Sequence, residues 1–484
     1  MKLEQTTTGV IIHQATTEVK RKVLQYFSLH DPVREYFIYS GNDKTRRPLF
    51  GREHDVIYIS SGFLKINDPV IRSLPKPSKV NYPTPKKVEI TMNREPRSPL
   101  QEDCIKKMLD TDNGYSKLTI ELKPGTGKTF IATYATSKLQ LKPLVVAPTT
   151  LLKNQWVEEF EGCGIPRQDI ATHIDDAPNK KMCVVTISAI ERELGRDWEH
   201  LMKVIHESSF GIKIVDEAHL HLKGMLRLDA ICNIKHNWYL SATLGRSDEM
   251  EDDILNRALL DADRFIGNAE YEEYQNEYVN IYMQDIYYNT TNKLCQQHFK
   301  YGKKGLIKAT YYRMLMAYQG GQPFMNNIKH LIKVAYNVKT YDGKILVLVP
   351  LLDVIQRLKE ELSRDPWFDR FNIVTVDGSL PLPVKRQALE DGTLILTTTM
   401  SVGTGTDIKN LACVVNFDQA ASPIILEQVA GRLRDRGKEC WFFDITDHVK
   451  QARSFENWGR QRRMLLPYFP GVKQQMKRLP DIRC

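Results

Sequence analysis

The chain has 484 residues, a length that predicts about three domains, and its 42% hydrophobic residues suffice for buried cores. No stretch approaches the ~18–20 apolar residues of a membrane helix. The first residues, MKLEQTTTGVIIHQ, hold one lysine and no long apolar segment, so we do not expect a secretory signal. The eight cysteines are scattered and form no C-x-x-C pair, which argues against a metal cluster or a disulfide framework. We therefore expect a soluble, cytoplasmic protein.

The net charge of +9 is unevenly distributed. Residues 1–99 hold 17 Lys and Arg against 10 Asp and Glu, and residues 450–484 hold 9 against 2, so each end carries +7 (17 − 10 and 9 − 2). The middle, 100–449, then sums to 9 − 14 = −5. Two basic ends on a mildly acidic body indicate surfaces that bind a polyanion, although solvated charged faces would give the same counts.

The first 73 residues combine strand-like runs with a helical stretch, which predicts a small α+β domain. The runs are GVIIHQ and DVIYIS, and the helical stretch is EVKRKVLQYF. Six prolines and many basic residues follow in 74–99. Because proline removes a backbone donor and disfavours helix before it, we expect an extended linker, and we assign 1–95 to this N-terminal domain and its linker.

From Leu118 onward, apolar runs of strand length alternate with helical patterns. Such runs are typical of parallel strands that are buried on both faces and joined by crossover helices. They fall into two groups and predict two α/β lobes, 96–245 and 341–446. The runs are KLTIEL, PLVVAP, CVVTIS, IKIVDE and WYLSAT, then KILVLVP, FNIVTVD, LILTTT, CVVNFD and CWFFDIT.

Two further segments complete the predicted organisation. Residues 246–340 begin with an acidic part, 246–285, that holds 12 Asp and Glu against 3 Arg, and we interpret the segment as a helical connector or insertion. Residues 447–484 form a basic C-terminal tail with aromatic residues.

The loop KPGTGKT joins the first strand of the first lobe to a helix, TFIATYATSKL. Backbone N–H groups from Gly125 to Thr129 would then face a phosphate at a helix N-terminus. The pattern G-x-x-x-x-G-K-[ST] assigns Lys128 to the β- and γ-phosphates and the Thr129 hydroxyl to Mg²⁺. Leu122, however, occupies the position of the first glycine, and G-T-G-K-T alone is also compatible with a glycine-rich turn.

The segment IVDEAHL, 214–220, favours the nucleotide site. Asp216 follows a strand at its C-terminal end, where α/β sheets bind ligands, and is suited to hold Mg²⁺, while Glu217 is suited to polarise water. Alone, the two acidic residues would fit a helix N-terminus. In YLSATLGR, Ser241 and Thr243 are placed to hydrogen-bond toward this segment, or to cap a helix.

The second lobe carries TTTMSVGTGTDI (397–408) and EQVAGRLRDRGK (427–438). An arginine of the latter stretch would stabilise charge on a γ-phosphate held by the other lobe. A basic helix C-terminus would show the same residues.

In this order, PGTGKT, DEAH, SAT, GTGTDI and QVAGR resemble the motifs of the superfamily 2 helicases and translocases. The resemblance covers 97–446. It implies two RecA-like parallel-sheet lobes with ATP and Mg²⁺ between them, and therefore a nucleic-acid-stimulated ATPase.

The resemblance also implies roles for individual residues. Catalysis would depend on Lys128, Asp216, Glu217, Arg432 and Arg434, and Mg²⁺ would be held by Thr129 and Asp216. ATP would be bound by Gln101, as the adenine reader in SPLQEDCI, and by Pro124, Gly125, Thr126, Gly127, Lys128, Thr129, Gly405 and Asp407. Coupling of hydrolysis to lobe movement would involve His219, Ser241, Thr243 and Gln428, and nucleic acid would be contacted by Thr149, Thr186 and Thr398.

The last motif departs from the family pattern Q-x-x-G-R-x-x-R, because Asp435 occupies its final position. Arg432 is therefore the firmer candidate for the arginine finger, and Arg434 is the second.

In size and layout the chain is most similar to the phage-encoded UvsW-like branch-migration helicases. This similarity implies a DNA helicase that acts on forked or branched DNA in recombination, repair or replication, in the cytoplasm of a host cell, with unknown protein partners. The basic N-terminal domain and tail would hold the duplex arms, and removal of 1–95 would keep basal ATPase activity. The alternatives are an RNA helicase, a restriction-type DNA translocase subunit and a non-catalytic nucleic-acid binder.

Overall fold

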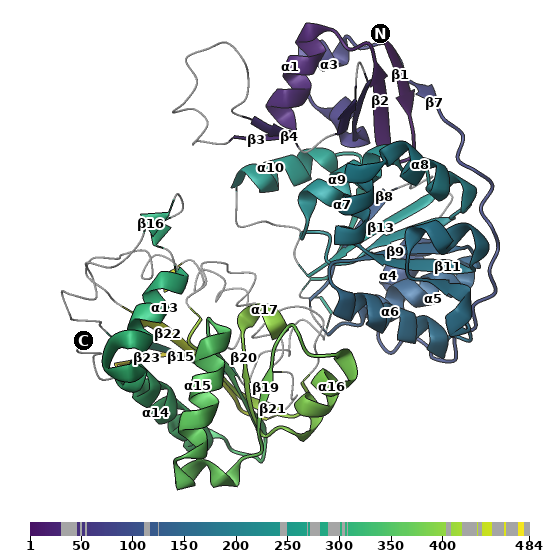
Figure 1. Cartoon of the computed structure of the whole chain (residues 1–484). Helices are drawn as coiled ribbons and strands as arrows, with labels where there is room; N and C mark the ends of the chain where they lie inside the picture. Colours follow the sequence, from purple (N-terminus) through teal and green to yellow (C-terminus); the bar gives the residue numbers. More distant parts are fainter. Residues whose placement is uncertain are drawn as a thin grey trace. The chain divides into compact units, whose positions relative to one another are not determined.

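The structure is a computed structural model of the whole chain (Figure 1). The chain forms two compact units, Met1–Tyr274 and Gln275–Cys484. The residues described are 1–30, 46–48, 51–53, 56–110, 117–123, 125–242, 249–268, 270–271, 281–288, 301–302, 305–306, 308–402, 408–418, 433, 438–447, 459–460 and 473–478.

The N-terminal domain is the small α+β domain that the sequence predicts. Its five-stranded sheet has the order β5-β6-β2-β1-β7, and β2 pairs with both β1 and β6 in antiparallel fashion. Helix α1 begins where the Thr16 side chain accepts a hydrogen bond from the Val19 N–H, an ordinary N-cap. The elements are β1 (Lys2–Gln5), β2 (Gly9–His13), α1 (Thr17–Tyr26), β3 (Ser28–His30), β4 (Arg46–Pro48), β5 (Gly51–Glu53), β6 (Val56–Ser60), η1 (Ser61–Lys65), α3 (Pro69–Arg72) and β7 (Ser78–Lys79).

The linker is extended, as its prolines predict, and its backbone is anchored along the first unit. Strand β7 adds to the edge of the small sheet beside β1. Further along, the Lys86 N–H donates to Ser209 O at 2.9 Å and the Val88 N–H donates to Gln140 O at 2.9 Å. Figure 1 shows the segment as a long trace beside the first lobe. The linker is therefore a fixed part of the first unit.

Lobe 1 is a seven-stranded parallel sheet with the order β10-β11-β9-β12-β13-β8-β14. Its central strands are buried along their whole length, because helices cover both faces. The strands are β8 (Lys117–Glu121), β9 (Pro143–Ala147), β10 (Ile170–Ala171), β11 (Met182–Thr186), β12 (Ile212–Val215), β13 (His236–Ser241) and β14 (Asp263–Ile266). The helices are α4 (Pro99–Leu109), α5 (Lys128–Leu139), α6 (Thr150–Gly162), η2 (Arg167–Asp169), η3 (Ile174–Asn179), α7 (Ile187–Arg196), α8 (Trp198–Glu207), α9 (Leu222–Ile231) and α10 (Glu249–Ala258).

The N-terminal domain and lobe 1 share one hydrophobic core. Val10, Ile57 and Phe63 of the domain belong to the same buried cluster as residues of α9 and α10 and as Val215 and Ala218, which flank Asp216. This shared core argues against the expectation that residues 1–95 can be removed without affecting lobe 1. Removing them would expose the apolar faces of α9 and α10, so loss of ATPase activity in such a deletion would not report on DNA binding.

Backbones also approach closely across this boundary. A Cβ on Gly9 would lie 2.5 Å from Ala230 O, and one on Gly62 would lie 2.3 Å from Arg257 O, so only glycine fits at either position. The buried Lys117 Nζ donates to Ser60 Oγ at 3.2 Å, which adds a polar contact between β8 and the domain.

The second unit contains another parallel sheet of seven strands, with the order β19-β20-β18-β21-β22-β15-β23. The strands are β15 (Ile281–Tyr288), β18 (Lys344–Leu348), β19 (Ile373–Val376), β20 (Leu394–Thr397), β21 (Leu411–Asn416), β22 (Cys440–Asp447) and β23 (Lys473–Arg478), with a two-stranded ribbon of β16 (Tyr301–Gly302) and β17 (Gly305–Leu306). The helices are α13 (Lys308–Ala317), η4 (Tyr318–Gly321), α14 (Gln322–Val338), α15 (Leu352–Ser363), η5 (Pro366–Arg370), α16 (Leu382–Asp391) and α17 (Thr399–Val402). The fold class of two parallel-sheet lobes with a small N-terminal domain is confirmed.

Segment 246–340 contains strands as well as the predicted helices. Strand β14 extends the lobe-1 sheet beside β8, and β15 lies inside the second sheet between β22 and β23. Helices α13 and α14 pack in the core of the second lobe. Strand β15 was not predicted because the neighbouring sequence is acidic, although its own sequence, IYMQDIYY, is rich in residues that favour strands.

Part of the predicted basic tail is also in a sheet. Strand β23, with the sequence KQQMKR, forms the sheet edge beside β15. Lysine and arginine are usual on edge strands, where they prevent pairing with other chains. The charge of this stretch therefore has a structural reason besides the predicted contact with nucleic acid.

Candidate functional site

The loop after β8 has the backbone of a phosphate-binding loop. Gly125 and Gly127 have φ of 91° and 89°, a left-handed region that favours glycine, and α5 begins at Lys128. Leu122, in the position of the usual first glycine, is fully buried, and its N–H donates to Ser241 O at 2.9 Å. Leu122 thus continues the sheet, and the glycine turn begins after it. Pro124 lies outside the described residues.

Gln101, on α4, holds this loop in place. Its Nε2 donates to Thr126 O at 2.8 Å, while its Oε1 accepts from the Arg97 N–H at 3.0 Å. A Cβ on Gly127 would lie 2.8 Å from Gln101 Nε2, which gives Gly127 a second reason to be glycine. The role of Gln101 as adenine reader stays a prediction.

The structure adds Arg97 to the loop. The guanidinium of Arg97 donates to Gly125 O at 2.9 Å, so two side chains hold neighbouring carbonyls of the loop. Sequence reasoning missed Arg97, although its position directly before Ser98, the N-cap of α4, was the available signal.

Lys128 lies in the first turn of α5, and its Nζ donates to Leu122 O at 3.0 Å. The side chain therefore folds back over the loop that it closes. Burial and the charge of Glu217 raise the pKa of Asp216, and the positive charge of Lys128 partly opposes this rise.

Asp216 and Glu217 follow β12 at the carboxyl edge of the sheet, as predicted. Asp216 is buried, and both of its oxygens accept hydrogen bonds: Oδ1 from the Glu217 N–H at 3.0 Å and Oδ2 from the indole N–H of Trp156 at 2.9 Å. Burial, and then the charge of Glu217, raise the pKa of Asp216 to about 6. Glu217 has φ of 46°, an uncommon conformation for a residue with a Cβ, and such conformations concentrate at functional sites.

The DEAH and SAT segments are joined by hydrogen bonds. His219 Nδ1 and Ser241 Oγ are 2.8 Å apart, and the Ala218 N–H donates to Leu240 O at 2.9 Å. His219 Nδ1 is also 3.5 Å from Glu217 Oε2. Because Leu122 binds the same end of β13, the phosphate loop and the acidic segment are both attached to this strand. Thr243 lies outside the described residues.

The three threonines predicted to contact nucleic acid all cap helices. Thr149 accepts from the Leu152 N–H and Thr186 from the Ala189 N–H, each at 3.3 Å, and Thr398 accepts from the Ser401 N–H at 3.2 Å. Each lies at the carboxyl end of a parallel strand, where helix N-termini present backbone donors suited to phosphates. Their contact with nucleic acid stays a prediction.

The motif residues predicted in the second lobe are mostly outside the part of the chain that the structure describes. This applies to Gly405, Asp407, Gln428, Arg432 and Arg434. No group of three or more His, Cys, Asp and Glu side chains arranged for a metal ion occurs among the described residues. None of the described helices is both long and apolar enough to cross a membrane.

Two family models match the chain. Residues 95–246 match the type III restriction enzyme res subunit, and residues 326–436 match the helicase conserved C-terminal domain. The chain carries both domains of a superfamily 2 helicase. The first match covers the phosphate loop and the DEAH and SAT segments of this helicase, and the second covers GTGTDI and QVAGR.

The solved structures of Dbp5 agree with this helicase in fold. Dbp5 of S. cerevisiae bound to RNA and ADP BeF3 aligns at 16% identity with a TM-score of 0.51, over 79% of this chain and 90% of Dbp5. A variant of Dbp5 in the same complex aligns over the same shares at 16% identity with a TM-score of 0.52. UvsW of T4 aligns at 16% identity with a TM-score of 0.36, over 99% of this chain and 100% of UvsW. Comparison with curated proteins finds no sequence match.

The helicase domains imply use of ATP, and the site in lobe 1 fits a divalent cation with it. Asp216 and Glu217 bring two carboxylates together, and Glu217 Oε2 is buried without a hydrogen-bond partner among the described residues. The raised pKa of Asp216 reflects the free-energy cost of these charges in a buried place. Mg²⁺ prefers oxygen ligands and would relieve that cost, with Asp216 and the Thr129 hydroxyl as the residues that would hold it.

The geometry suits each group to a chemical task in ATP hydrolysis. The left-handed turn at Gly125 and Gly127 would direct backbone N–H groups toward phosphate oxygens, and Lys128 would neutralise their charge. A bound Mg²⁺ would supply further charge neutralisation on the phosphates. Glu217 Oε2 accepts no hydrogen bond from the described residues and lies 3.5 Å from His219 Nδ1, so it would be suited to orient a water molecule and accept its proton.

Proposed function

We propose that this helicase is an ATP-driven motor that acts on forked or branched DNA. The main support for motor function is that the phosphate loop and the Asp216–Glu217 segment are both hydrogen-bonded to the end of β13. Leu122 and Ala218 both donate backbone hydrogen bonds to the end of β13, and His219 contacts Ser241 there. A change at Glu217 on hydrolysis would therefore reach the SAT segment directly.

In the proposed cycle, Arg432 of the second lobe senses the γ-phosphate that lobe 1 holds. Binding of ATP closes the two lobes, and loss of the γ-phosphate opens them. If helix N-termini at Thr149 and Thr186 grip one strand in lobe 1, and Thr398 grips it in the second lobe, alternate closure moves the protein along that strand. Phosphate contacts do not read sequence, so binding would depend on structure and salt.

The linker is a candidate for a second surface that binds DNA. Its backbone is anchored, and five basic side chains are exposed with no acidic residue between them. An anchored row of exposed cations suits the phosphate backbone of a duplex arm. These side chains are Arg72, Lys76, Lys79, Lys86 and Lys87.

Point variants test this surface better than removal of 1–95, which would damage the shared core. The test variant carries glutamine at Lys76, Lys79, Lys86 and Lys87, and the control variant at the equally exposed Lys106, Lys138, Lys203 and Lys409. For a four-way junction, we expect the slope of log K against log salt to fall by up to ~0.9 per lost phosphate contact in the test variant only. Equal slopes in both variants would exclude the linker surface.

The match to the type III restriction enzyme res subunit favours one other function, a translocase on unbranched duplex DNA. The two functions predict different activators. A branch-specific motor is stimulated more by a fork or junction than by linear duplex of equal length, whereas a duplex translocase is stimulated equally by both.

A further inference from the structure

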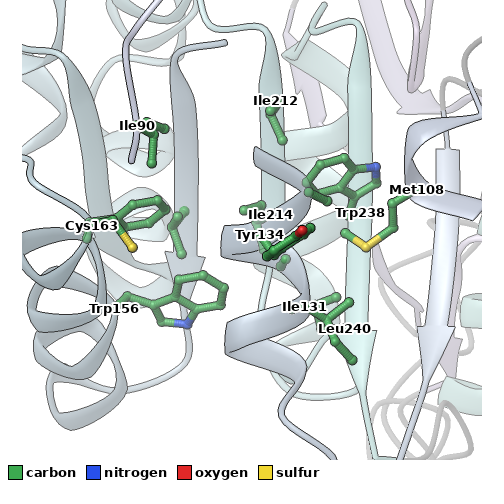
Figure 2. Close-up of a cluster of buried hydrophobic side chains, with 14 of the residues drawn as sticks. Ile90, Met108, Ile131, Tyr134, Trp156, Cys163, Ile212, Ile214, Trp238 and Leu240 are labelled. Atoms are coloured by element: carbon green, nitrogen blue, oxygen red, sulfur yellow. The ribbon is translucent and has the colours of Figure 1, made fainter. Parts of the chain in front are cut away.

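Trp156 donates a hydrogen bond from its indole N–H to Oδ2 of Asp216, at 2.9 Å. The two residues are 60 positions apart and lie on α6 and after β12. Trp156 is fully buried in the core of lobe 1, and Figure 2 shows its indole, with the ring nitrogen in blue, among the hydrophobic side chains of that core. Packing in a hydrophobic core does not by itself require the N–H.

The bond completes the orientation of the Asp216 carboxylate. Oδ1 is held by the Glu217 N–H at 3.0 Å, and Oδ2 is held by the indole at 2.9 Å. An indole N–H donates and never accepts, so this contact requires an acceptor atom in one fixed direction, here Oδ2 of Asp216. The ring itself stacks on Phe160, with centroids 6.0 Å apart, which limits rotation of the indole.

The same helix carries a residue predicted to contact nucleic acid. α6 begins directly after Thr149, and Trp156 lies seven positions further, about two turns along the helix. β9, which leads into α6, pairs with β12, which leads into Asp216. A small displacement of α6 on its strand would therefore move the indole relative to the Asp216 carboxylate.

We propose that Trp156 is a positioning residue that orients Asp216 for the divalent cation and transmits displacement of α6 to it. This inference rests on the proposed motor function. In this proposal, α6 links the helix N-terminus at Thr149, which is predicted to contact nucleic acid, to the carboxylate that would hold the cation. This link is additional to the contact of His219 with Ser241. Trp156 acts only through Asp216.

The test is Trp156→Phe, which keeps an aromatic ring and removes the N–H. The matched control is Trp238→Phe, the same substitution in the same buried cluster, on β13. Three quantities are measured for each full-length variant: the calorimetric affinity for ADP with and without Mg²⁺, the Mg²⁺ concentration at half-maximal ATPase activity, and the stimulation of ATPase activity by nucleic acid.

For Trp156→Phe we expect a rise of about tenfold in the Mg²⁺ concentration required, because loss of a residue that orients a metal ligand typically costs 10–100-fold in affinity. We also expect ADP to bind as in the wild type without Mg²⁺ and more weakly with it, and nucleic-acid stimulation to fall. Mg²⁺ dependence equal to that of Trp238→Phe would overturn the inference.

Phe160→Leu keeps the N–H and removes only the stacked ring, so it replaces Trp156→Phe if that variant does not fold. It should give a smaller increase of about threefold in the Mg²⁺ requirement, and no increase would likewise overturn the inference. If the wild type shows no nucleic-acid-stimulated ATPase activity, the proposed function itself fails. A wild-type motor with unchanged Mg²⁺ dependence in the Trp156 variant rejects the positioning role alone.

Discussion

Replacing Gly62 with alanine would place a methyl group against the backbone of α10. The new Cβ would lie 2.3 Å from Arg257 O and 2.6 Å from Ala258 O, whereas ordinary contacts begin at 3.4 Å. Relief requires a separation of about 1 Å between the N-terminal domain and lobe 1, because both neighbours are backbone atoms. The hydrogen bond from Ser60 Oγ to Ala258 O, 2.7 Å long, spans the same boundary and would lengthen with it.

The expected loss of stability follows from these two effects. Overpacking of this kind costs ~1–3 kcal/mol, and a weakened hydrogen bond costs ~1 kcal/mol. Together they lower the free energy of unfolding by roughly 2–4 kcal/mol. In a unit of this size, 1 kcal/mol shifts the melting temperature by ~2–4 °C, so Gly62→Ala should melt ~5–15 °C below the wild type.

The matched control is Gly195→Ala in α7, where an added Cβ meets nothing within 4 Å. Alanine is favoured over glycine in a helix by ~0.5–1 kcal/mol, so the same substitution should raise stability there. Thermal unfolding followed by circular dichroism measures both variants. If Gly62→Ala melts with the wild type, the N-terminal domain is not fixed to lobe 1 by the contacts described.

Three further predictions concern lobe 1. Lys213 Nζ and Asp229 Oδ1 form a fully buried ion pair of 2.5 Å. Lys213→Met should therefore lower the free energy of unfolding, measured with denaturant, by ~3–5 kcal/mol, and the double variant with Asp229→Leu should lower it much less. A loss below ~1 kcal/mol in the single variant would contradict this prediction. Glu217→Gln should lower kcat for ATP hydrolysis by ~10²–10⁴ while ADP with Mg²⁺ still binds in calorimetry, and an unchanged kcat would remove Glu217 from catalysis. Burial lowers the pKa of His236 to about 4, so the unfolded chain takes up this proton first and the folded state loses up to ~3 kcal/mol as pH falls from 6.5 to 4. His236→Gln should lose less stability over that range, and an equal loss would assign the acid sensitivity to other groups.

The sequence predicted the central strands because buried parallel strands are continuous apolar runs. All ten runs identified in the two lobes contain strands in the structure. The strands that were not predicted, such as β14, β15 and β23, lack such runs: β14 is a four-residue edge strand, β15 is rich in tyrosine beside an acidic stretch, and β23 is largely basic. Local composition does not show that tertiary context pairs these segments with a sheet.

Within the site, spacing identified the residues that follow strand ends and missed those that reach in from elsewhere. Lys128, Asp216 and Ser241 lie where the motifs place them, each beside the carboxyl end of a parallel strand. Arg97 and Trp156 contact the loop and Asp216 through packing of α4 and α6 on the sheet. No spacing rule relates Trp156 to a residue 60 positions away, so this contact is visible only in three dimensions.

The shared core changes how the N-terminal domain is understood. The sequence predicts that 1–95 is a DNA-binding domain together with its proline-rich linker, and that its removal keeps basal ATPase activity. In the structure, Val215 and Ala218 pack in the same cluster as Val10 and Phe63, so the domain supports the segment that carries Asp216. DNA bound by this domain would therefore be held in fixed geometry relative to the ATP site of lobe 1.

The most direct test of the central claim is the ATPase rate with single-stranded DNA, linear duplex, a fork, a four-way junction, RNA or no nucleic acid. Lys128→Ala serves as the inactive control, because Lys128 closes the phosphate loop. We predict a low basal rate, the largest stimulation by the fork or junction, and no activity in the control. Stimulation by RNA without stimulation by branched DNA, or full activity in Lys128→Ala, would contradict the account.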